Sequence, residues 1–239
     1  MGKFHSKSIK LNIFNLQISI PVNKLLFGLI IVMFAFGLYL VLVVTRVDAE
    51  QQMAQKIFYF HVPSAWSMFL AYFLVLIAGI QYLRTRAKKW DRFGLASAEV
   101  GTLFCVLVLI TGPIWATPIW GTPWSWEPRL TTTLILFLIY VGYFMLRQYG
   151  GDRKQIARLS AIIGIIAFID VPFIYFSINL WAERDQVHPQ SDMGGQPTDV
   201  LGTFLFMLLT FTILLSYMIR YRMHVLELDT KLTELEHGI

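Results

Sequence analysis

The residues Trp115-Ala-Thr-Pro-Ile-Trp-Gly-Thr-Pro-Trp-Ser-Trp-Glu-Pro-Arg129 separate two long apolar runs near the middle of the chain. Four of the protein's seven tryptophans fall in this stretch, together with Pro118, Pro123 and Pro128. Because proline lacks the backbone donor of a helix and its ring clashes with the preceding turn, we expect irregular backbone here. Tryptophan is apolar with one polar N–H, so it suits a membrane–water interface. The stretch therefore predicts a surface loop between two membrane spans.

The four tryptophans of this loop are Trp115, Trp120, Trp124 and Trp126. An aromatic belt at a membrane interface is the alternative explanation, and it accounts for one or two of them. Four at this spacing favour a planar, hydrophobic platform for a ligand.

The composition indicates an integral membrane protein. Hydrophobic residues make up 56% of the chain and charged residues only 15%, which excludes an ordinary soluble domain and a disordered chain. The single cysteine, Cys105, lies in an apolar run, so the chain forms no internal disulfide and no cysteine-based metal cage. The net charge is +5, but the basic residues punctuate apolar segments and do not gather on one face, so we expect no nucleic-acid partner.

Six apolar runs have the length that a helix needs to cross a bilayer. They predict an all-α bundle of six transmembrane helices in a single domain, residues 1–239. The first run is longer than the core of a signal peptide, although Val47-Asp-Ala49 loosely mimics a cleavage site, so we interpret it as an uncleaved helix. The predicted spans are 25–44, 62–83, 93–112, 129–147, 157–177 and 200–219.

The lysines and arginines predict the orientation of these spans, because cytoplasmic segments carry an excess of them. Sixteen of the twenty lie in the N-terminal segment, in the second and fourth connections and in the C-terminal tail. Both termini are therefore expected in the cytoplasm. Three connections, 45–61, 113–128 and 178–199, are expected on the outer face. The four basic residues on that face are Arg46, Lys56, Arg129 and Arg184.

Two of the five histidines, His61 and His188, flank the tryptophan loop on the expected outer face. Two neutral imidazoles beside a large apolar surface are what a six-coordinate haem iron requires. Pro63 suits the first turn of the second span, which would put His61 at the helix start. Zinc is the rival metal, with Glu127 or Asp185 as a further ligand, but zinc does not explain the tryptophans.

Glu127 and Arg129 lie where the fourth span begins. Glu127 is expected to act as a helix cap near the positive end of the helix dipole. Arg129 suits a carboxylate such as a haem propionate, because its planar guanidinium matches that group. Two acids lie inside apolar spans. We expect Glu99 to pair with a basic residue, and Asp170 to support the outer site beside a kink at Pro172.

Three segments carry a resemblance to a known family. Trp120-Gly-Thr-Pro-Trp-Ser-Trp-Glu-Pro-Arg-Leu-Thr131, with Gly112-Pro-Ile-Trp115 before it, resembles the tryptophan-rich "WWD" signature of haem-handling proteins of cytochrome c biogenesis. Lys56-Ile-Phe-Tyr-Phe-His-Val-Pro-Ser-Ala-Trp66 is similar to the first axial-histidine motif of the cytochrome c maturation protein C family, also called haem exporter protein C. Residues 171–189 are similar to its second histidine segment. The chain departs from the signature at Glu127, where aspartate is usual, and at Pro123, where tryptophan is usual.

The resemblance covers residues 25–220 in the same order and implies a haem-delivery protein. It implies that His61 and His188 ligate haem b on the outer face, against a site that the loop tryptophans, Glu127 and Arg129 complete. Haem would pass to a membrane-anchored haem chaperone. The implied complex also contains ATP-binding cassette (ABC-type) subunits and a small membrane subunit, in the bacterial cytoplasmic (inner) membrane.

Three alternatives remain open at this stage. A b-type haem oxidoreductase subunit would usually carry histidines within helices near both membrane faces, whereas both candidates here lie on one face. The larger synthetase subunit of the second cytochrome c biogenesis system shares the signature. A permease without a bound cofactor is the third. The chain contains no ATP-binding motif and no nucleophile with an oriented base, so we expect a transport protein and not an enzyme.

Overall fold

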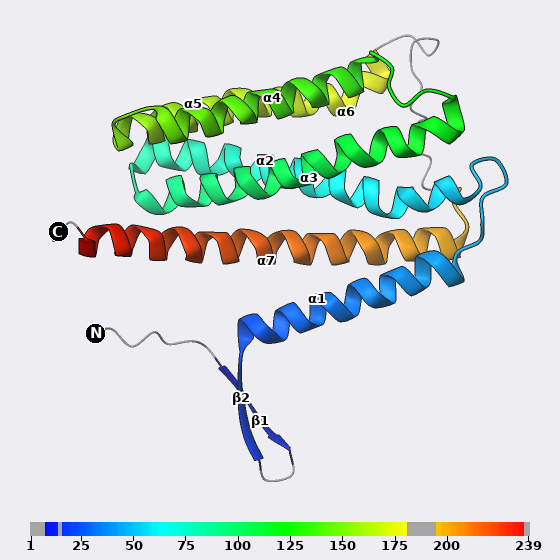
Figure 1. Ribbon diagram of the computed structural model, residues 1–239, viewed down its shortest axis with the longest axis horizontal. Coiled ribbons are helices and arrows are strands. Elements are labelled where there is room, and N and C mark those ends of the chain that lie inside the picture. The colour runs from blue at the N-terminus through cyan, green and yellow to red at the C-terminus, as the bar shows by residue number, and fades with distance from the viewer. Residues whose placement is uncertain (1–7, 14–15, 181–194, 237–239) are drawn as a thin grey trace.

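The computed structural model describes residues 8–13, 16–180 and 195–236, with side chains from residue 23 to 177 and from 195 to 236. The chain forms an elongated bundle of long helices (Figure 1). The helical elements are α1 (Val22–Tyr39) with a π-helical turn η1 (Leu40–Val44), a 3-10 turn η2 (Met53–Ile57), α2 (Phe58–Thr85), α3 (Lys88–Trp120), α4 (Pro128–Tyr149), α5 (Arg153–Phe168), α6 (Asp170–Leu180) and α7 (Thr198–Glu236).

The six predicted transmembrane helices are confirmed. In the described part of the chain six helical segments are long and apolar enough to cross a membrane, and the shortest contains 22 residues. At 1.5 Å per residue such a helix is about 33 Å long, slightly more than the hydrocarbon core of a bilayer. The segments are Asn23–Val44, Met53–Thr85, Lys88–Trp120, Pro128–Tyr149, Arg153–Ser177 and Thr198–Glu236.

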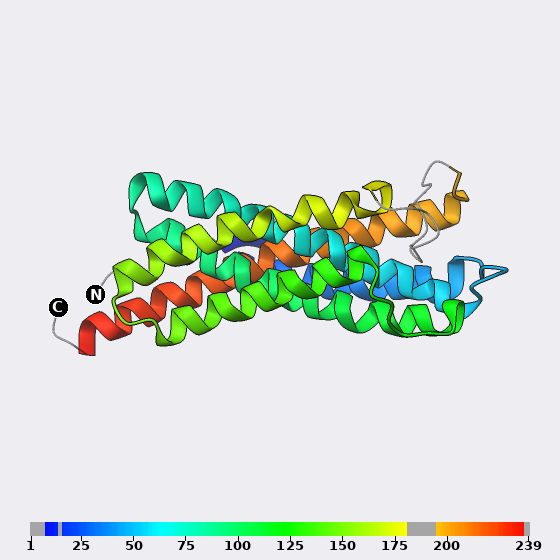
Figure 2. The same cartoon turned by 90° about the horizontal axis from the view of Figure 1, so that it is seen from above.

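The helices lie roughly antiparallel in layers. α4, α5 and α6 lie on one side, α2 and α3 in the middle, and α7 and α1 on the other side (Figure 1). Seen from above, the helices follow the long axis of the bundle (Figure 2). The most extensive contact joins α2 to α3, whereas α1 packs mainly against α7. Both described ends of the chain lie away from the end at which residues 45–52 and 121–127 connect the helices. Two of the connections predicted to share one face, 45–61 and 113–128, therefore meet at one end of the bundle, whereas most of the third, 178–199, lies outside the described residues.

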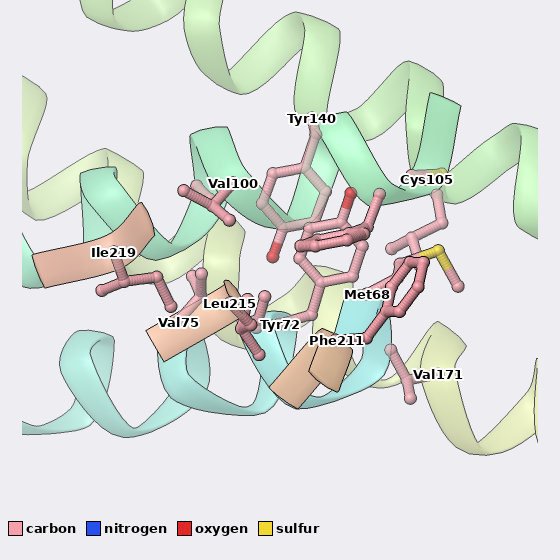
Figure 3. Close-up of a cluster of buried hydrophobic side chains, with 14 of the residues drawn as sticks. Met68, Tyr72, Val75, Val100, Cys105, Tyr140, Val171, Phe211, Leu215 and Ile219 are labelled. Carbon is pink, nitrogen blue, oxygen red and sulfur yellow. The ribbon is translucent and has the colours of Figure 1, made fainter. Parts of the chain in front are cut away.

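A closed core fills the middle of the bundle (Figure 3). The ring of Tyr72 stacks on that of Tyr140, with centroids 4.0 Å apart and an interplanar angle of 11°. Cys105 is fully buried in the same cluster, as expected of a small hydrophobic residue. Aromatic side chains that interdigitate in this way stabilise the packing beyond their buried area.

Small residues allow α2 and α3 to approach closely. A Cβ atom added at Gly101 of α3 would lie 2.9 Å from the Cβ atom of Ala71 and 3.0 Å from the ring of Tyr72. Between membrane helices, where lipid is as apolar as the side chains, close packing of this kind drives association. The middle of the bundle therefore depends on Gly101 having no side chain.

Two bidentate ion pairs lie towards the end of the bundle that is opposite the 121–127 connection. Arg147 donates to both carboxylate oxygens of Asp91, at 2.8 and 3.1 Å. Arg222 donates to both oxygens of Glu99, at 2.5 and 2.8 Å. The expectation that Glu99 pairs with a basic residue is thus confirmed, and the partner is on α7.

The predicted irregular backbone over Trp115–Arg129 is wrong for its first six residues. α3 continues to Trp120 with Pro113 and Pro118 inside it, and only Gly121 to Glu127 connects the helices. Proline is tolerated in membrane helices because side chains and neighbouring groups satisfy the freed carbonyls. In the same turn the Thr117 hydroxyl donates to the Pro113 carbonyl at 2.8 Å, which is a bond within the helix and not to a carbonyl that a proline frees. Gly121, at φ +74°, ends the helix in the left-handed conformation.

The expected start of the second helix is also wrong. η2 and α2 begin at Met53 and Phe58, so His61 lies inside the helix and Pro63 in its interior. The fifth span is interrupted at Ile169, between α5 and α6, where a kink near Pro172 was predicted. A proline ring clashes with the carbonyl of the residue four positions earlier, and α5 ends at that residue, Phe168.

A short antiparallel hairpin precedes the bundle. Its strands β1 (Ser8–Ile13) and β2 (Leu16–Pro21) pair from Ser8 opposite Pro21 to Ile13 opposite Leu16. The hairpin projects from the start of α1 (Figure 1). The expected all-α fold contains no such strands, and the hairpin corrects it. The alternating apolar residues of the two strands (Ile9, Leu11 and Ile13, then Leu16, Ile18 and Ile20) are the signal in the sequence that indicates them.

Candidate ligand-binding site

A cavity of about 540 Å³ lies at the end of the bundle where residues 121–127 connect α3 to α4. This volume falls in the range of small-molecule and cofactor sites. Its walls come from η2, from five helices and from the connections between them, and most of the lining surface is apolar. The lining residues include His61, Phe69, Gly112, Trp115, Trp120, Trp124, Arg129, Tyr175 and Gln196.

Two helix faces form much of the wall. His61, Ala65 and Phe69 follow one another at four-residue spacing on α2, so they lie on one face of that helix. Gly112, Ala116 and Trp120 do the same on α3. The helical course of residues 115–120 is therefore what directs Trp115 and Trp120 to the cavity.

His61 is held by α3. Its Nδ1 atom lies 2.8 Å from the hydroxyl oxygen of Thr111, and that hydroxyl donates to the carbonyl of Leu107 at 2.7 Å. The imidazole meets the Trp115 indole edge to face, with centroids 5.6 Å apart and an interplanar angle of 66°. A polar anchor and an aromatic neighbour together orient the ring.

The four predicted tryptophans separate into two groups. Trp115, Trp120 and Trp124 line the cavity, whereas Trp126 does not and is 76% exposed. Trp115 donates its indole N–H to the side-chain oxygen of Gln51 at 3.1 Å. Trp124 and Trp126 meet edge to face at 5.8 Å, so the exposed ring is supported by one in the wall.

Arg129 and Glu127 differ in their placement. Arg129 lines the cavity and donates to the backbone carbonyls of Ile174 and Tyr175, at 3.4 and 3.2 Å. Glu127 is buried at the N-cap position of α4, where its carbonyl accepts from Thr131 at 3.0 Å. Its side chain makes no capping hydrogen bond and does not line the cavity.

His188, together with Trp181 and Asp185, lies outside the described residues. Described residues on either side of that segment, Tyr175 of α6 and Gln196 before α7, both line the cavity. Asp170 was expected to support the site. One of its carboxylate oxygens is buried and has no hydrogen-bond partner in the described part of the chain, and Asp170 does not line the cavity.

Sequence reasoning missed the polar contacts that fasten this end of the bundle. Arg46, just after η1, donates to both carboxylate oxygens of Asp199 at 2.9 and 3.1 Å, and that carboxylate raises the pKa of the Arg46 guanidinium. The buried ammonium of Lys56 donates to the hydroxyl and carbonyl of Thr45 and to the carbonyl of Arg46. Thr45 is the C-cap of η1 and Arg46 follows it, so the lysine lies at the end of the helix where the dipole favours a cation.

Among the residues with described positions, no three His, Cys, Asp or Glu side chains gather into a metal site. The zinc alternative would thus depend on residues outside that part of the chain. What the geometry defines is a multi-pass membrane protein with a largely apolar ligand cavity at one end, a histidine in its wall and an arginine at its edge.

Comparison with known proteins places this class more narrowly. The family model of "Heme exporter protein C" matches residues 10–236. "Heme exporter protein C" of Bradyrhizobium diazoefficiens is 35% identical over 186 residues, which cover 77% of this chain and 70% of that protein. The protein of the same name from Haemophilus influenzae is 33% identical over 208 residues, 85% and 84% of the two chains. A putative cytochrome c biosynthesis ccmC-like mitochondrial protein of Marchantia polymorpha is 34% identical over 171 residues, 72% of each chain.

The chain belongs to the haem exporter protein C family. The predicted resemblance is confirmed, and with it a place among the proteins of cytochrome c biogenesis. The family names denote a transport component rather than an enzyme.

Proposed function

We propose that this protein binds haem b at the outer face of the bacterial inner membrane, through His61 and His188, and delivers it to a haem chaperone. Haem is the cargo in this proposal. The observation that carries it is the position of His61 in the wall of a largely apolar cavity of about 540 Å³, beside Trp115. An imidazole offers the iron a nitrogen ligand, while apolar and aromatic walls suit a porphyrin.

The polar groups of the cavity fit the two carboxylates of haem. Arg129 lines the cavity, and the hydrogen bonds that its guanidinium makes to α6 go to two backbone carbonyls and not to a carboxylate. The indole nitrogen of Trp124 is a buried donor without a partner in the described residues. A propionate accepts hydrogen bonds from both kinds of group, and a guanidinium matches a carboxylate in geometry and charge.

Chain length supports the second histidine. His188 is eight residues before Gln196, which lines the cavity. A chain reaches at most about 3.3–3.6 Å per residue, so eight residues allow a reach of nearly 30 Å. His188 is therefore within reach of the same cavity as His61, as two axial ligands of one iron require.

Delivery to a second protein fits the exposed part of the site. Trp126 is 76% exposed beside Trp124, which lines the cavity, so an apolar ring is offered to the outside next to the bound cargo. Aromatic side chains of this kind are enriched in protein interfaces. The proposed recipient is a membrane-anchored haem chaperone. The proposed complex further contains ABC-type ATPase and membrane subunits, which supply the energy, and a small membrane subunit.

The test is the haem content and absorption spectrum of the purified protein. The wild type is expected to bind one haem with a six-coordinate spectrum. His61→Ala and His188→Ala are each expected to lose that spectrum. His224→Ala is the matched control, because it removes a histidine of α7 far along the helix from the cavity. If both site variants keep the wild-type spectrum, the ligand assignment is wrong.

A further inference from the structure

Thr111 of α3 contacts the imidazole of His61, and this contact bears on which ring nitrogen carries the proton. The Thr111 hydroxyl has one hydrogen, and the Leu107 carbonyl, 2.7 Å away, can only accept it. The same oxygen lies 2.8 Å from Nδ1 of His61. With its hydrogen already used, the hydroxyl can only accept from the imidazole, so neutral His61 carries its proton on Nδ1.

The consequence for the site is chemical. In the Nδ1–H tautomer the lone pair of the ring is on Nε2, so Nε2 is the nitrogen that can ligate a metal. Metal-bound histidines usually donate their other N–H to a protein group, and this second bond orients the ring and makes the ligand more basic. In this protein Thr111 of α3 is the group that accepts the hydrogen bond from the Nδ1–H of His61.

The rest of the imidazole's surroundings are consistent with a prepared orientation. The Trp115 ring meets the imidazole edge to face one helical turn beyond Thr111. Gly112 also packs against the ring, because a Cβ atom added there would lie 3.4 Å from Cε1 of His61, an ordinary contact. One turn of α3 thus supplies the hydrogen-bond acceptor and the aromatic contact.

We propose that Thr111 is a positioning residue, which holds His61 in the Nδ1–H tautomer and so presents Nε2 to the haem iron. The inference rests on the proposed function only for the identity of the metal. The tautomer itself is a property of the protein without haem, and it can be measured separately.

The experiment compares Thr111→Val, which keeps the shape and removes the hydroxyl, with Thr111→Ser, which keeps the hydroxyl. Nitrogen-15 NMR of the haem-free protein, labelled at histidine and assigned with His61→Ala, is expected to show the Nδ1–H tautomer for wild type and the serine variant. The valine variant is expected to lose this preference. A wild-type His61 with its proton on Nε2 overturns the proposal, whatever the variants do.

The haem-loaded proteins provide the second measurement. Loss of such a supporting bond commonly lowers metal affinity by roughly 10- to 100-fold. Thr111→Val is expected to bind haem that much more weakly and to raise its reduction potential, because a less basic imidazole stabilises ferric iron less. Thr111→Ser is expected to restore both. Wild-type affinity and potential in Thr111→Val overturn the role of Thr111. Absence of haem from the wild type contradicts the proposed function and leaves the tautomer result standing.

Discussion

The middle of the bundle and its loop end, where residues 121–127 connect α3 to α4, are built by the same helices. They differ in how closely those helices pack. In the middle, Gly101 of α3 lies against Ala71 of α2, and Tyr72 stacks on Tyr140 at 4.0 Å. At the loop end α2 and α3 instead face each other with His61 and Trp115, and the cavity lies there. The comparison shows that the same pair of helices can pack closely in one place and border a cavity in another. In the middle Gly101 allows the close approach, and at the other end the faces that carry His61 and Trp120 line the cavity.

The largest expected effect is the loss of stability when a side chain is removed from the closely packed middle of the bundle. Phe104 is 1% exposed and touches the ring of Phe211. Phe104→Ala is expected to lower the free energy of unfolding by about 3–5 kcal/mol, as large-to-small changes in close-packed cores do. Phe69→Ala removes an equal side chain from the cavity wall, where space already exists, and is expected to cost less than half as much. Unfolding in detergent mixtures measures both, and equal losses would contradict the distinction.

A smaller effect is expected from adding one methyl group in each region. Gly101→Ala places a Cβ atom 2.9 Å from that of Ala71 and is expected to cost about 1–3 kcal/mol of unfolding free energy, because the packed helices must separate. Gly112→Ala places it 3.4 Å from His61, which is an ordinary contact. It is expected to be neutral, since alanine is also the better helix former. The same unfolding assay checks the pair, and a destabilised Gly112→Ala with an unaffected Gly101→Ala would reverse the account.

The tryptophans at the loop end are expected to affect function and not the fold. Replacing Trp120, Trp124 and Trp126 with alanine is expected to reduce haem loading of the chaperone about tenfold, or about 1.4 kcal/mol. The fold is expected to persist, because the closed middle is untouched. Trp90→Ala, at the far end of α3, is the control. Normal chaperone loading by the triple variant would show that the loop serves another purpose.

The smallest effect concerns two stacked tyrosines in the middle. The Tyr140 hydroxyl is buried without a partner in the described residues, whereas that of Tyr72 lies 3.2 Å from the Thr102 hydroxyl. Tyr140→Phe is expected to leave stability unchanged or raise it by up to about 1 kcal/mol, and Tyr72→Phe to lower it by about 0.5–1.5 kcal/mol. Thermal unfolding of the two variants side by side provides the check, with a clear destabilisation by Tyr140→Phe as the contrary result.

The sequence was sufficient for the spans, for the shared end of the first two outer connections and for five residues of the cavity wall, His61, Trp115, Trp120, Trp124 and Arg129. Bilayer thickness restricts helix length, and the tryptophans are concentrated in one stretch. It was insufficient for the helical course of Trp115–Trp120. Proline argues against a helix in water, but membrane helices tolerate it, and α3 continues through Pro113 and Pro118 to Trp120.

The polar supports of the site were also beyond the sequence. Thr111 is fifty residues from His61 in the sequence, and no local pattern distinguishes it from other threonines in apolar helices. Only the packing of α2 on α3 brings the two residues together. The partnership of Lys56 with Thr45 and of Arg46 with Asp199 likewise depends on how the helix ends meet. Such pairings follow from tertiary structure and have no local pattern.

The most direct test of the account is low-temperature electron paramagnetic resonance of the ferric haem complex, with wild type and His61→Ala compared under the same conditions. Two imidazole ligands on one iron predict a low-spin signal in the wild type and its replacement by a high-spin signal in the variant. A wild-type complex that is already high-spin, or a variant that keeps the low-spin signal, would contradict the claim that His61 binds the iron.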